Sequence, residues 1–185
     1  KLIVVKIGSR VLTTAEGLLD IERVEHIGQQ CHELLNSGKQ IVVVSSGAVG
    51  VGMGRLGMHD KPHTLTELQA VAAVGQSCLT EAYERALGSY GQHVAQLLLV
   101  ADDLHDRGRY LNIRNTLRSL LKYGAIPIVN ENDSVSTAEL QTTFGDNDHL
   151  AALVATLLGA DALILLSDVE CLFDQDPENP ESRRV

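Results

Sequence analysis

Lys6 is the charged residue that points most directly to chemistry, because it stands near the end of the apolar segment 2–7. A lysine near the end of a buried strand costs free energy unless its ammonium group pairs with an anion or a carboxylate. Gly8 would let the backbone approach that anion, and Ser9 would add a hydroxyl and an N–H group. The alternative is a lysine whose ammonium extends past the strand end into solvent. Taken alone, the segment fits both interpretations.

Three further apolar runs also end in clusters of polar residues. Hydroxyls and backbone N–H groups after a strand suit an anion, whereas carboxylates and amides suit an ammonium group, a Mg²⁺ ion or a lysine. Each cluster also has a plainer explanation as a turn or a solvated loop. The clusters are Ser45, Ser46, Gly47 and Ala48 after the run 41–44, Asn130, Glu131, Asn132 and Asp133 after the run 126–129, and Ser167 and Asp168 after the run 163–166.

Amides and carboxylates gather again at the start of a predicted helix near residue 147. Asp146 is explained as the N-cap of this helix, and Asp148 gains a smaller benefit from the helix dipole. Neither preference explains Asn147, and neither explains Asp133 at the end of the preceding cluster. These two residues are therefore candidates for binding a charged ligand.

Hydrophobic spacing predicts the elements that must position these groups. Continuous apolar runs predict strands buried on both faces, and apolar residues at helical spacing predict the helices between them. Strand and helix alternate five times, which predicts a three-layer α/β/α sandwich around a doubly wound, mostly parallel sheet. The expected strands lie at about 2–7, 40–45, 94–100, 125–129 and 162–166, and the expected helices at about 20–38, 64–88, 113–124 and 146–159.

The polar clusters are expected to form one site. The carboxyl ends of parallel strands share one edge of a sheet, and open α/β sheets bind their ligands beyond that edge. All four apolar runs would then deliver their polar residues to the same crevice.

A glycine-rich segment at 47–57 contains the spacing G-x-G-x-x-G at positions 52, 54 and 57, which is typical of dinucleotide-binding proteins. That motif should pass directly from a strand into a helix in the first βα unit. Here residues 45–49 intervene, and the first unit carries Lys-Ile-Gly-Ser instead. We therefore set an NAD(P)-dependent enzyme aside and expect a flexible loop whose backbone approaches a ligand or a neighbouring helix.

The composition is that of an ordinary globular protein with one domain. Of 185 residues, 44% are hydrophobic and 3% are aromatic, so the core must be aliphatic. A formal charge of −9 argues against sequence-independent nucleic-acid binding, which needs a basic surface. No apolar run approaches the ~20 residues of a membrane span, no signal peptide is recognised, and the three cysteines have no metal-ligand spacing. We expect a cytoplasmic protein that binds neither membrane nor nucleic acid.

Five sequence blocks, at 4–9, 44–48, 72–76, 130–133 and 145–148, occur together and in this order. They resemble the amino acid kinase family, and within it the glutamate kinases that begin proline synthesis. The segment that starts at Arg107 (Arg-Gly-Arg-Tyr-Leu-Asn-Ile-Arg-Asn-Thr-Leu) is similar to the same branch and argues against aspartokinases and acetylglutamate kinases. The resemblance extends over essentially the whole chain.

The resemblance implies transfer of the γ-phosphate of ATP to the γ-carboxylate of L-glutamate, with Mg²⁺ bound to the nucleotide and no metal ligand from the protein. Lys6 would bridge the phosphates, and Asp148 would orient the catalytic lysines. Feedback inhibition by proline and assembly into a homo-oligomer are implied as well. The remaining implied roles are donation of N–H groups to the phosphates by Gly8 and Ser9, glutamate binding by Ser46, Gly47, Asp133 and Asn147, and nucleotide contact by Ser167 and Asp168.

The sequence departs from the family pattern in two places. Leu68 stands where the family usually has a lysine. Family members also continue with a Gly-Thr-Gly-Gly-Met-x-Thr-Lys segment that carries a second catalytic lysine and much of the ATP site. That segment is absent from this sequence, as is a C-terminal PUA domain. We therefore expect residues 1–185 to be an amino acid kinase domain cut before the second lysine, with a glutamate half-site and weak ATP binding.

Two alternatives stay open. One is another kinase of the same family, acting on aspartate, acetylglutamate, carbamate or UMP. The other is a non-catalytic module that senses an amino acid such as proline or glutamate.

Overall fold

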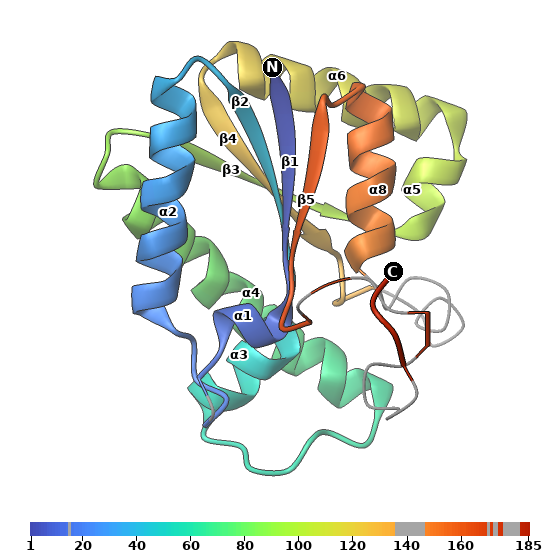
Figure 1. Cartoon of the computed structure of the whole chain (residues 1–185). Coiled ribbons are helices and arrows are strands. Elements are labelled where there is room, and N and C mark those ends of the chain that lie inside the picture. Colours follow the sequence, from blue (N-terminus) through green and yellow to red (C-terminus); the bar gives the residue numbers. More distant parts are fainter. Residues whose placement is uncertain (15, 136–146, 170, 172–173, 176–181) are drawn as a thin grey trace.

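The computed structural model describes residues 1–14, 16–135, 147–169, 171, 174–175 and 182–185. Its centre is a five-stranded sheet with the order β3-β4-β2-β1-β5, in which each strand runs parallel to its neighbours. Figure 1 shows β1 and its neighbours β2 and β5 running from the edge where the chain begins toward the edge where the short helix α1 (Ser9–Leu12) lies. The strands are β1 (Leu2–Ile7), β2 (Gln40–Ser45), β3 (His93–Leu99), β4 (Ala125–Glu131) and β5 (Ala162–Leu166).

Helices cover both faces of this sheet. On one face lie α2 (Ile21–Asn36) and α4 (Leu65–Gly88), and on the other lie α6 (Arg107–Lys122) and α8 (Asn147–Leu158). The shorter helices α3 (Ala48–Leu56) and α5 (Ala101–His105) follow β2 and β3. The predicted three-layer sandwich with a doubly wound parallel sheet is confirmed. Within the described ranges, no helix is both long enough and apolar enough to cross a membrane.

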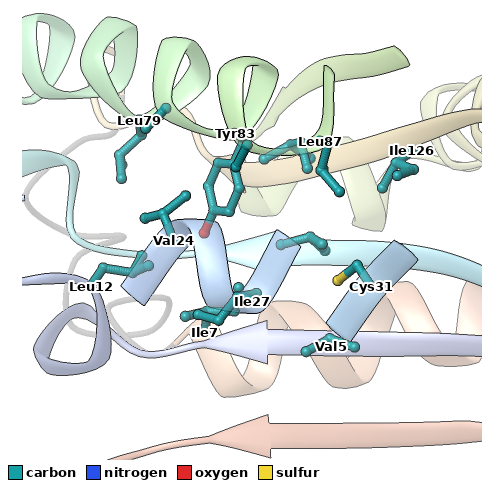
Figure 2. Close-up of a cluster of buried hydrophobic side chains, with 14 of the residues drawn as sticks. Val5, Ile7, Leu12, Val24, Ile27, Cys31, Leu79, Tyr83, Leu87 and Ile126 are labelled. Carbon is teal, nitrogen blue, oxygen red and sulfur yellow. The ribbon is translucent and has the colours of Figure 1, made fainter. Parts of the chain in front are cut away.

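The residues of β1 alternate between two hydrophobic clusters. Ile3, Val5 and Ile7 join the cluster beneath α2 and α4, whereas Val4 joins the cluster beneath α6 and α8. Figure 2 shows the first cluster, in which side chains from α2 and α4 gather with those of β1. Because successive side chains of a strand point to opposite faces, Lys6 lies on the face of Val4, toward α8. The alternation within β1 therefore decides which helix the lysine meets.

The predicted starts of two helices are confirmed by their caps. The Asp20 carboxylate accepts a hydrogen bond from the Arg23 N–H group at the start of α2. Thr64 and Glu67 form a reciprocal capping box at the start of α4, in which each side chain accepts from the backbone N–H group of the other. The cap predicted for α8, Asp146, lies outside the described residues.

The predicted flexible loop at 47–57 is wrong, because most of this segment forms α3. A Cβ added to Gly52 would lie 2.0 Å from the carbonyl oxygen of Val71, and one added to Gly75 would lie 1.8 Å from that of Ala48. These glycines let the backbones of α3 and α4 touch. The expected approach of this backbone segment to a neighbouring helix is therefore observed. The close packing outweighs the low helix propensity of glycine.

Smaller differences concern element boundaries. β4 continues through Asn130 and Glu131, which are 1% and 8% exposed. Two of the four polar residues expected after this strand therefore belong to it. The helices α1 and α5 were not predicted, because segments of four and five residues are too short to carry a helical period.

Candidate active site

The candidate site lies at the edge of the sheet where β1, β2, β4 and β5 end. Lys6 pairs in register with Val44 of β2 and Leu165 of β5, so it has a strand on either side. Its ammonium nitrogen lies 2.6 Å from a carboxylate oxygen of Asp148, in the first turn of α8. With Lys6 only 8% exposed, the alternative of a lysine that reaches into solvent is wrong.

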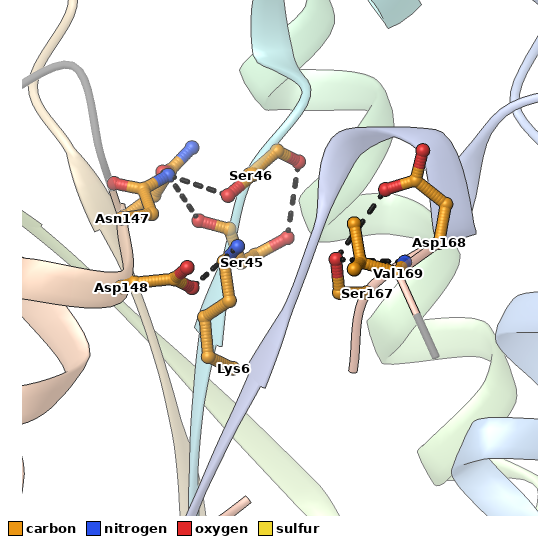
Figure 3. A network of polar contacts seen from close by, with 9 residues as sticks. Lys6, Ser45, Ser46, Asn147, Asp148, Ser167, Asp168 and Val169 are labelled. Carbon is orange, nitrogen blue, oxygen red and sulfur yellow. Dashed lines mark hydrogen bonds and ion pairs between the residues drawn. The ribbon is translucent and has the colours of Figure 1, made fainter. Parts of the chain in front are cut away.

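Asn147 connects α8 to the ends of β2 and β4. Its amide nitrogen lies 2.9 Å from the carbonyl oxygen of Ser45, 2.7 Å from the hydroxyl oxygen of Ser46 and 3.1 Å from the side-chain oxygen of Asn130. Figure 3 shows the contacts of Asn147 with Ser45 and Ser46 beside the ion pair between Lys6 and Asp148. The amide nitrogen of Asn147 is thus committed to acceptors of the protein itself.

The side-chain oxygen of Asn147 has a different environment. It is buried, and no described residue donates a hydrogen bond to it. A buried acceptor without a donor costs free energy, and in native proteins such atoms usually have a partner of some kind. Among the described residues this oxygen therefore lacks the donor that a buried acceptor requires.

Two further carboxamides support this network. The amide nitrogen of Asn130 donates to the side-chain oxygen of Gln76 on α4, at 2.7 Å. The side-chain oxygen of Asn130 accepts from the Glu131 N–H group at 2.9 Å, in addition to its contact with Asn147. The sequence placed Asn130 in a polar cluster suited to an ammonium group, a Mg²⁺ ion or a lysine, but it predicted no individual role for Asn130 and none at all for Gln76. The signal that could have found them is a pair of polar residues in segments that are otherwise buried.

Tyr83 supports the end of β2 from the opposite face. Its hydroxyl oxygen lies 3.1 Å from that of Ser45, and the tyrosine is completely buried. Burial raises the pKa of the Tyr83 hydroxyl above its ordinary value. The hydroxyl therefore stays protonated and remains a hydrogen-bond partner for Ser45, which holds the turn that contains Ser46.

The turns after β1 and β2 contact each other. Gly47 has a φ of 92°, a left-handed conformation that favours glycine. A Cβ on Gly47 would lie 3.4 Å from the Cα of Ser9. The structure therefore brings together a residue predicted to bind glutamate and one predicted to bind nucleotide.

Gly8 differs from the prediction in one respect. Its N–H group donates to the carbonyl oxygen of Leu166 at 2.9 Å, so this N–H group is not available to a phosphate. A Cβ on Gly8 would lie 3.2 Å from that same oxygen and 3.6 Å from the ammonium nitrogen of Lys6. The glycine contributes space beside the lysine, and its hydrogen bond ties β1 to the end of β5.

Ser167 and Asp168 form a separate polar group after β5. Arg10 donates to the Asp168 carboxylate at 2.7 Å, and this hydrogen bond lowers the pKa of that carboxyl group. The Ser167 hydroxyl donates to the other carboxylate oxygen at 3.3 Å. Both residues are exposed. Their hydrogen bonds given above are with Arg10 and with each other, and not with the network around Asn147.

Asp133 lies just beyond the end of β4. Burial raises its pKa from 3.8 to about 6, and the negative charge of Glu131 adds to this effect. A carboxyl group in this position is mostly ionised at neutral pH but changes charge in mildly acidic solution. The described residues contain no group of three or more His, Cys, Asp or Glu side chains that could hold a metal ion.

Comparison with known protein families shows which family the chain belongs to. A model described as "Amino acid kinase family" matches residues 1–185. The chain belongs to the amino acid kinase family. The fold agrees, because an aspartate kinase from Synechocystis superposes with a TM-score of 0.62 at 20% identity, over 99% of this chain and 31% of that one.

Three amino acid kinases named glutamate 5-kinase show the level of sequence similarity. The protein of Rhodopirellula baltica is 50% identical over 100% of this chain and 48% of its own length. That of Thermus thermophilus is 48% identical over 100% of this chain and 50% of its own length. That of Clostridium perfringens is 46% identical over 100% of this chain and 70% of its own length. The chain thus spans about half the length of the first two relatives.

Proposed function

We propose that this amino acid kinase chain is the glutamate-binding part of a glutamate 5-kinase, which uses ATP to phosphorylate the γ-carboxylate of L-glutamate. One arrangement supports the proposal: a buried lysine paired with Asp148 lies next to Asn147, whose buried side-chain oxygen has no donor among the described residues. A cation beside an unused acceptor suits a substrate with carboxylates and an ammonium group. The relatives' names supply the reaction.

The chemical problem in this reaction is charge. The γ-carboxylate is already an anion, so it needs no general base, but it must approach a triphosphate. One of its oxygens forms a bond to the γ-phosphorus while the bond to the leaving oxygen of ADP breaks. Catalysis of such transfers comes mainly from positioning and charge stabilisation. Lys6 would offset the repulsion between the two anions, and Asp148 would direct its ammonium group. The positive charge is local, which reconciles the formal net charge of −9 with anionic substrates.

The glutamate site would lie between the ends of β2 and β4 and the start of α8. The side-chain oxygen of Asn147 and the carboxylate of Asp133 would accept hydrogen bonds from the α-ammonium group. The hydroxyl of Ser46 and the backbone of Gly47 would serve a carboxylate of the substrate.

The nucleotide would approach from the turns after β1 and β5. Lys6, the space left by Gly8, and the backbone at Ser9 would receive the phosphates, while Ser167 and Asp168 would contact the rest of ATP. Mg²⁺ would be held by the phosphates of the nucleotide, as the family resemblance implies.

The remaining proposals follow from the resemblance. Residues 1–185 would form the first part of the kinase domain, with a second catalytic lysine in the portion of the relatives that this chain does not cover. Proline would act as a feedback inhibitor, because it carries the α-carboxylate and the ammonium group that glutamate also presents. The protein would form a homo-oligomer in the cytoplasm and would bind neither membrane nor nucleic acid.

Two assays test the proposed function. Isothermal titration of the chain with L-glutamate tests the binding site. For the reaction, the chain is fused to the portion of the Rhodopirellula baltica protein that it does not cover, and this fusion is called the completed enzyme. We expect the chain alone to bind glutamate, and the completed enzyme to form a hydroxamate from glutamate, ATP and hydroxylamine. Hydroxamate formation from aspartate or acetylglutamate in preference to glutamate would favour another kinase of the family. Binding without transfer in the completed enzyme would favour a sensor.

A further inference from the structure

Three carboxamide side chains form a continuous chain of hydrogen bonds from α4 to the candidate site. Gln76 accepts from Asn130 at 2.7 Å, and Asn130 in turn accepts from Asn147 at 3.1 Å. A carboxamide has a donor end and an acceptor end, so the orientation of each group constrains that of the next. These hydrogen bonds therefore hold the three side chains in place and also relate the orientation of each carboxamide to that of its neighbour.

Asn130 is the fixed centre of this chain. It lies on the same face of β4 as Ile126 and Ile128, toward α4, and it is 1% exposed. Its oxygen accepts from the Glu131 N–H group at 2.9 Å, and its nitrogen donates to Gln76 at 2.7 Å. With both ends used, a reversed carboxamide would set donor against donor at Glu131 and acceptor against acceptor at Gln76. One orientation is therefore favoured.

The orientation of Asn147 follows from that of Asn130. The oxygen of Asn130, together with the carbonyl of Ser45 and the hydroxyl of Ser46, attracts the amide nitrogen of Asn147. The opposite end of the same carboxamide is then the buried oxygen, which has no donor among the described residues.

We propose that Gln76 is a positioning residue, which acts through Asn130 to present the Asn147 oxygen to the ammonium group of an amino acid substrate. The inference rests on the proposed function, because it assumes an amino acid in this site. It also gives a role to the block 72–76, in which Gly75 allows α4 to touch the first carbonyl of α3 and Gln76 reaches toward β4.

Gln76 can be changed without disturbing the hydrophobic core. It is half-buried and borders a cavity of about 400 Å³ that is also lined by Thr80 and Gln96. Gln76→Met removes the acceptor at similar side-chain size, and Gln76→Glu keeps an oxygen in place to accept from Asn130. Gln96→Met is the matched control, because Gln96 lines the same cavity but donates to Thr80 at 2.7 Å and is not among the described hydrogen-bond partners of Asn130 and Asn147.

The experiment is isothermal titration of the chain and its variants with L-glutamate and with glutarate, which is glutamate without the α-amino group. We expect Gln76→Met to raise the glutamate Kd by roughly 5- to 10-fold, the effect of one neutral hydrogen bond, and to leave the glutarate Kd nearly unchanged. Gln76→Glu should restore most of the glutamate affinity, and Gln96→Met should bind both ligands as the wild type does.

Other results would overturn the inference in distinguishable ways. If the wild-type chain does not bind glutamate, the proposed function fails and the inference fails with it. If the wild type binds but Gln76→Met weakens both ligands equally, or Gln76→Glu binds no better than Gln76→Met, only the inference fails. A Gln76→Met chain that does not fold, while Gln96→Met does, would make the role of Gln76 structural.

Discussion

The ammonium nitrogen of Lys6 lies 2.6 Å from a carboxylate oxygen of Asp148, yet the two side chains are unequally covered, at 10% and 41% exposure. The lysine is the buried partner, and the aspartate is partly exposed, although the carboxylate oxygen that faces the lysine is buried. A buried ammonium group is costly unless it is paired, so Asp148 offsets that cost and also fixes the direction of the ammonium group. The pair fixes the position of the Lys6 ammonium group at the strand edge.

Removing the charge of Lys6 should affect the chemical step. In the completed enzyme we expect Lys6→Ala to lower kcat by at least ~10²-fold, by analogy with the loss of one donor to a developing anion. Hydroxamate formation at saturating substrates measures this. The control is Lys122→Ala, which removes an exposed lysine at the end of α6 and should leave kcat unchanged. Near-normal turnover in Lys6→Ala would exclude Lys6 from the mechanism.

Asp148 should act through Lys6. Asp148→Asn keeps the size of the side chain but removes the charge that directs the ammonium group, so we expect kcat to fall by about 10-fold or more. In a Lys6→Ala background the same change should cause little further loss, because residues that act as a unit are not additive. A full additional loss in the double variant would give Asp148 a role that is independent of Lys6.

The sequence was sufficient for the sheet because every strand is a largely apolar run, and the three central strands β1, β2 and β4 are buried along most of their length. Runs such as 41–44 are apolar throughout, which indicates a central parallel strand. Once the strands are parallel, the position of Lys6 and Asp148 at one edge follows from topology alone. This is why the ion pair lies where the motifs suggested, although the two residues are far apart in the chain.

The parts that the sequence could not predict depend on tertiary contacts. The glycines of α3 favour a loop by propensity, and only the approach of Gly52 and Gly75 to backbone atoms of the other helix explains a helix there. The bond between Gln76 and Asn130 depends on how α4 crosses β4, which no local pattern encodes. For the same reason, nothing in the sequence indicated that the Gly8 N–H group is used by β5.

Asp133 should make glutamate binding pH-dependent. Burial, with a contribution from Glu131, raises its pKa from 3.8 to about 6. If the ionised carboxylate binds the substrate ammonium, the glutamate Kd should rise by up to ~10-fold per pH unit as the pH falls below that value. Asp133→Asn should bind more weakly at neutral pH but show a flatter profile. Calorimetric titration over this range measures both proteins, and parallel profiles would contradict the assigned role.

The same pKa has a consequence for stability. The folded protein takes up the Asp133 proton at about pH 6, whereas an unfolded chain does so near 3.8. The contribution of this carboxyl group to stability is therefore greatest in acid and is lost as the pH rises through that interval. We expect Asp133→Asn to be more stable than the wild type at neutral pH, with a difference that shrinks toward pH 4. Urea unfolding at both pH values measures it, and a difference independent of pH would contradict the shift.

Gly75 should be among the least replaceable residues of α4. A Cβ there would lie 1.8 Å from the Ala48 carbonyl oxygen and 2.6 Å from the Gly52 nitrogen, and both are backbone atoms that cannot rotate away. Gly75→Ala should therefore destabilise the fold by about 1–3 kcal/mol or more, the usual cost of overpacking.

Gly88→Ala is the matched control, because it adds the same methyl group at the end of the same helix, where no atom lies within 4 Å. It should leave stability unchanged or raise it slightly. Since Ala48 follows Gly47 directly, the displaced backbone in Gly75→Ala should also weaken glutamate binding, while Gly88→Ala binds normally. Urea unfolding and calorimetric titration measure the two effects. Equal stability of the two variants would mean that α3 and α4 have room to separate, so that their contact does not hold the turn at Ser46 and Gly47.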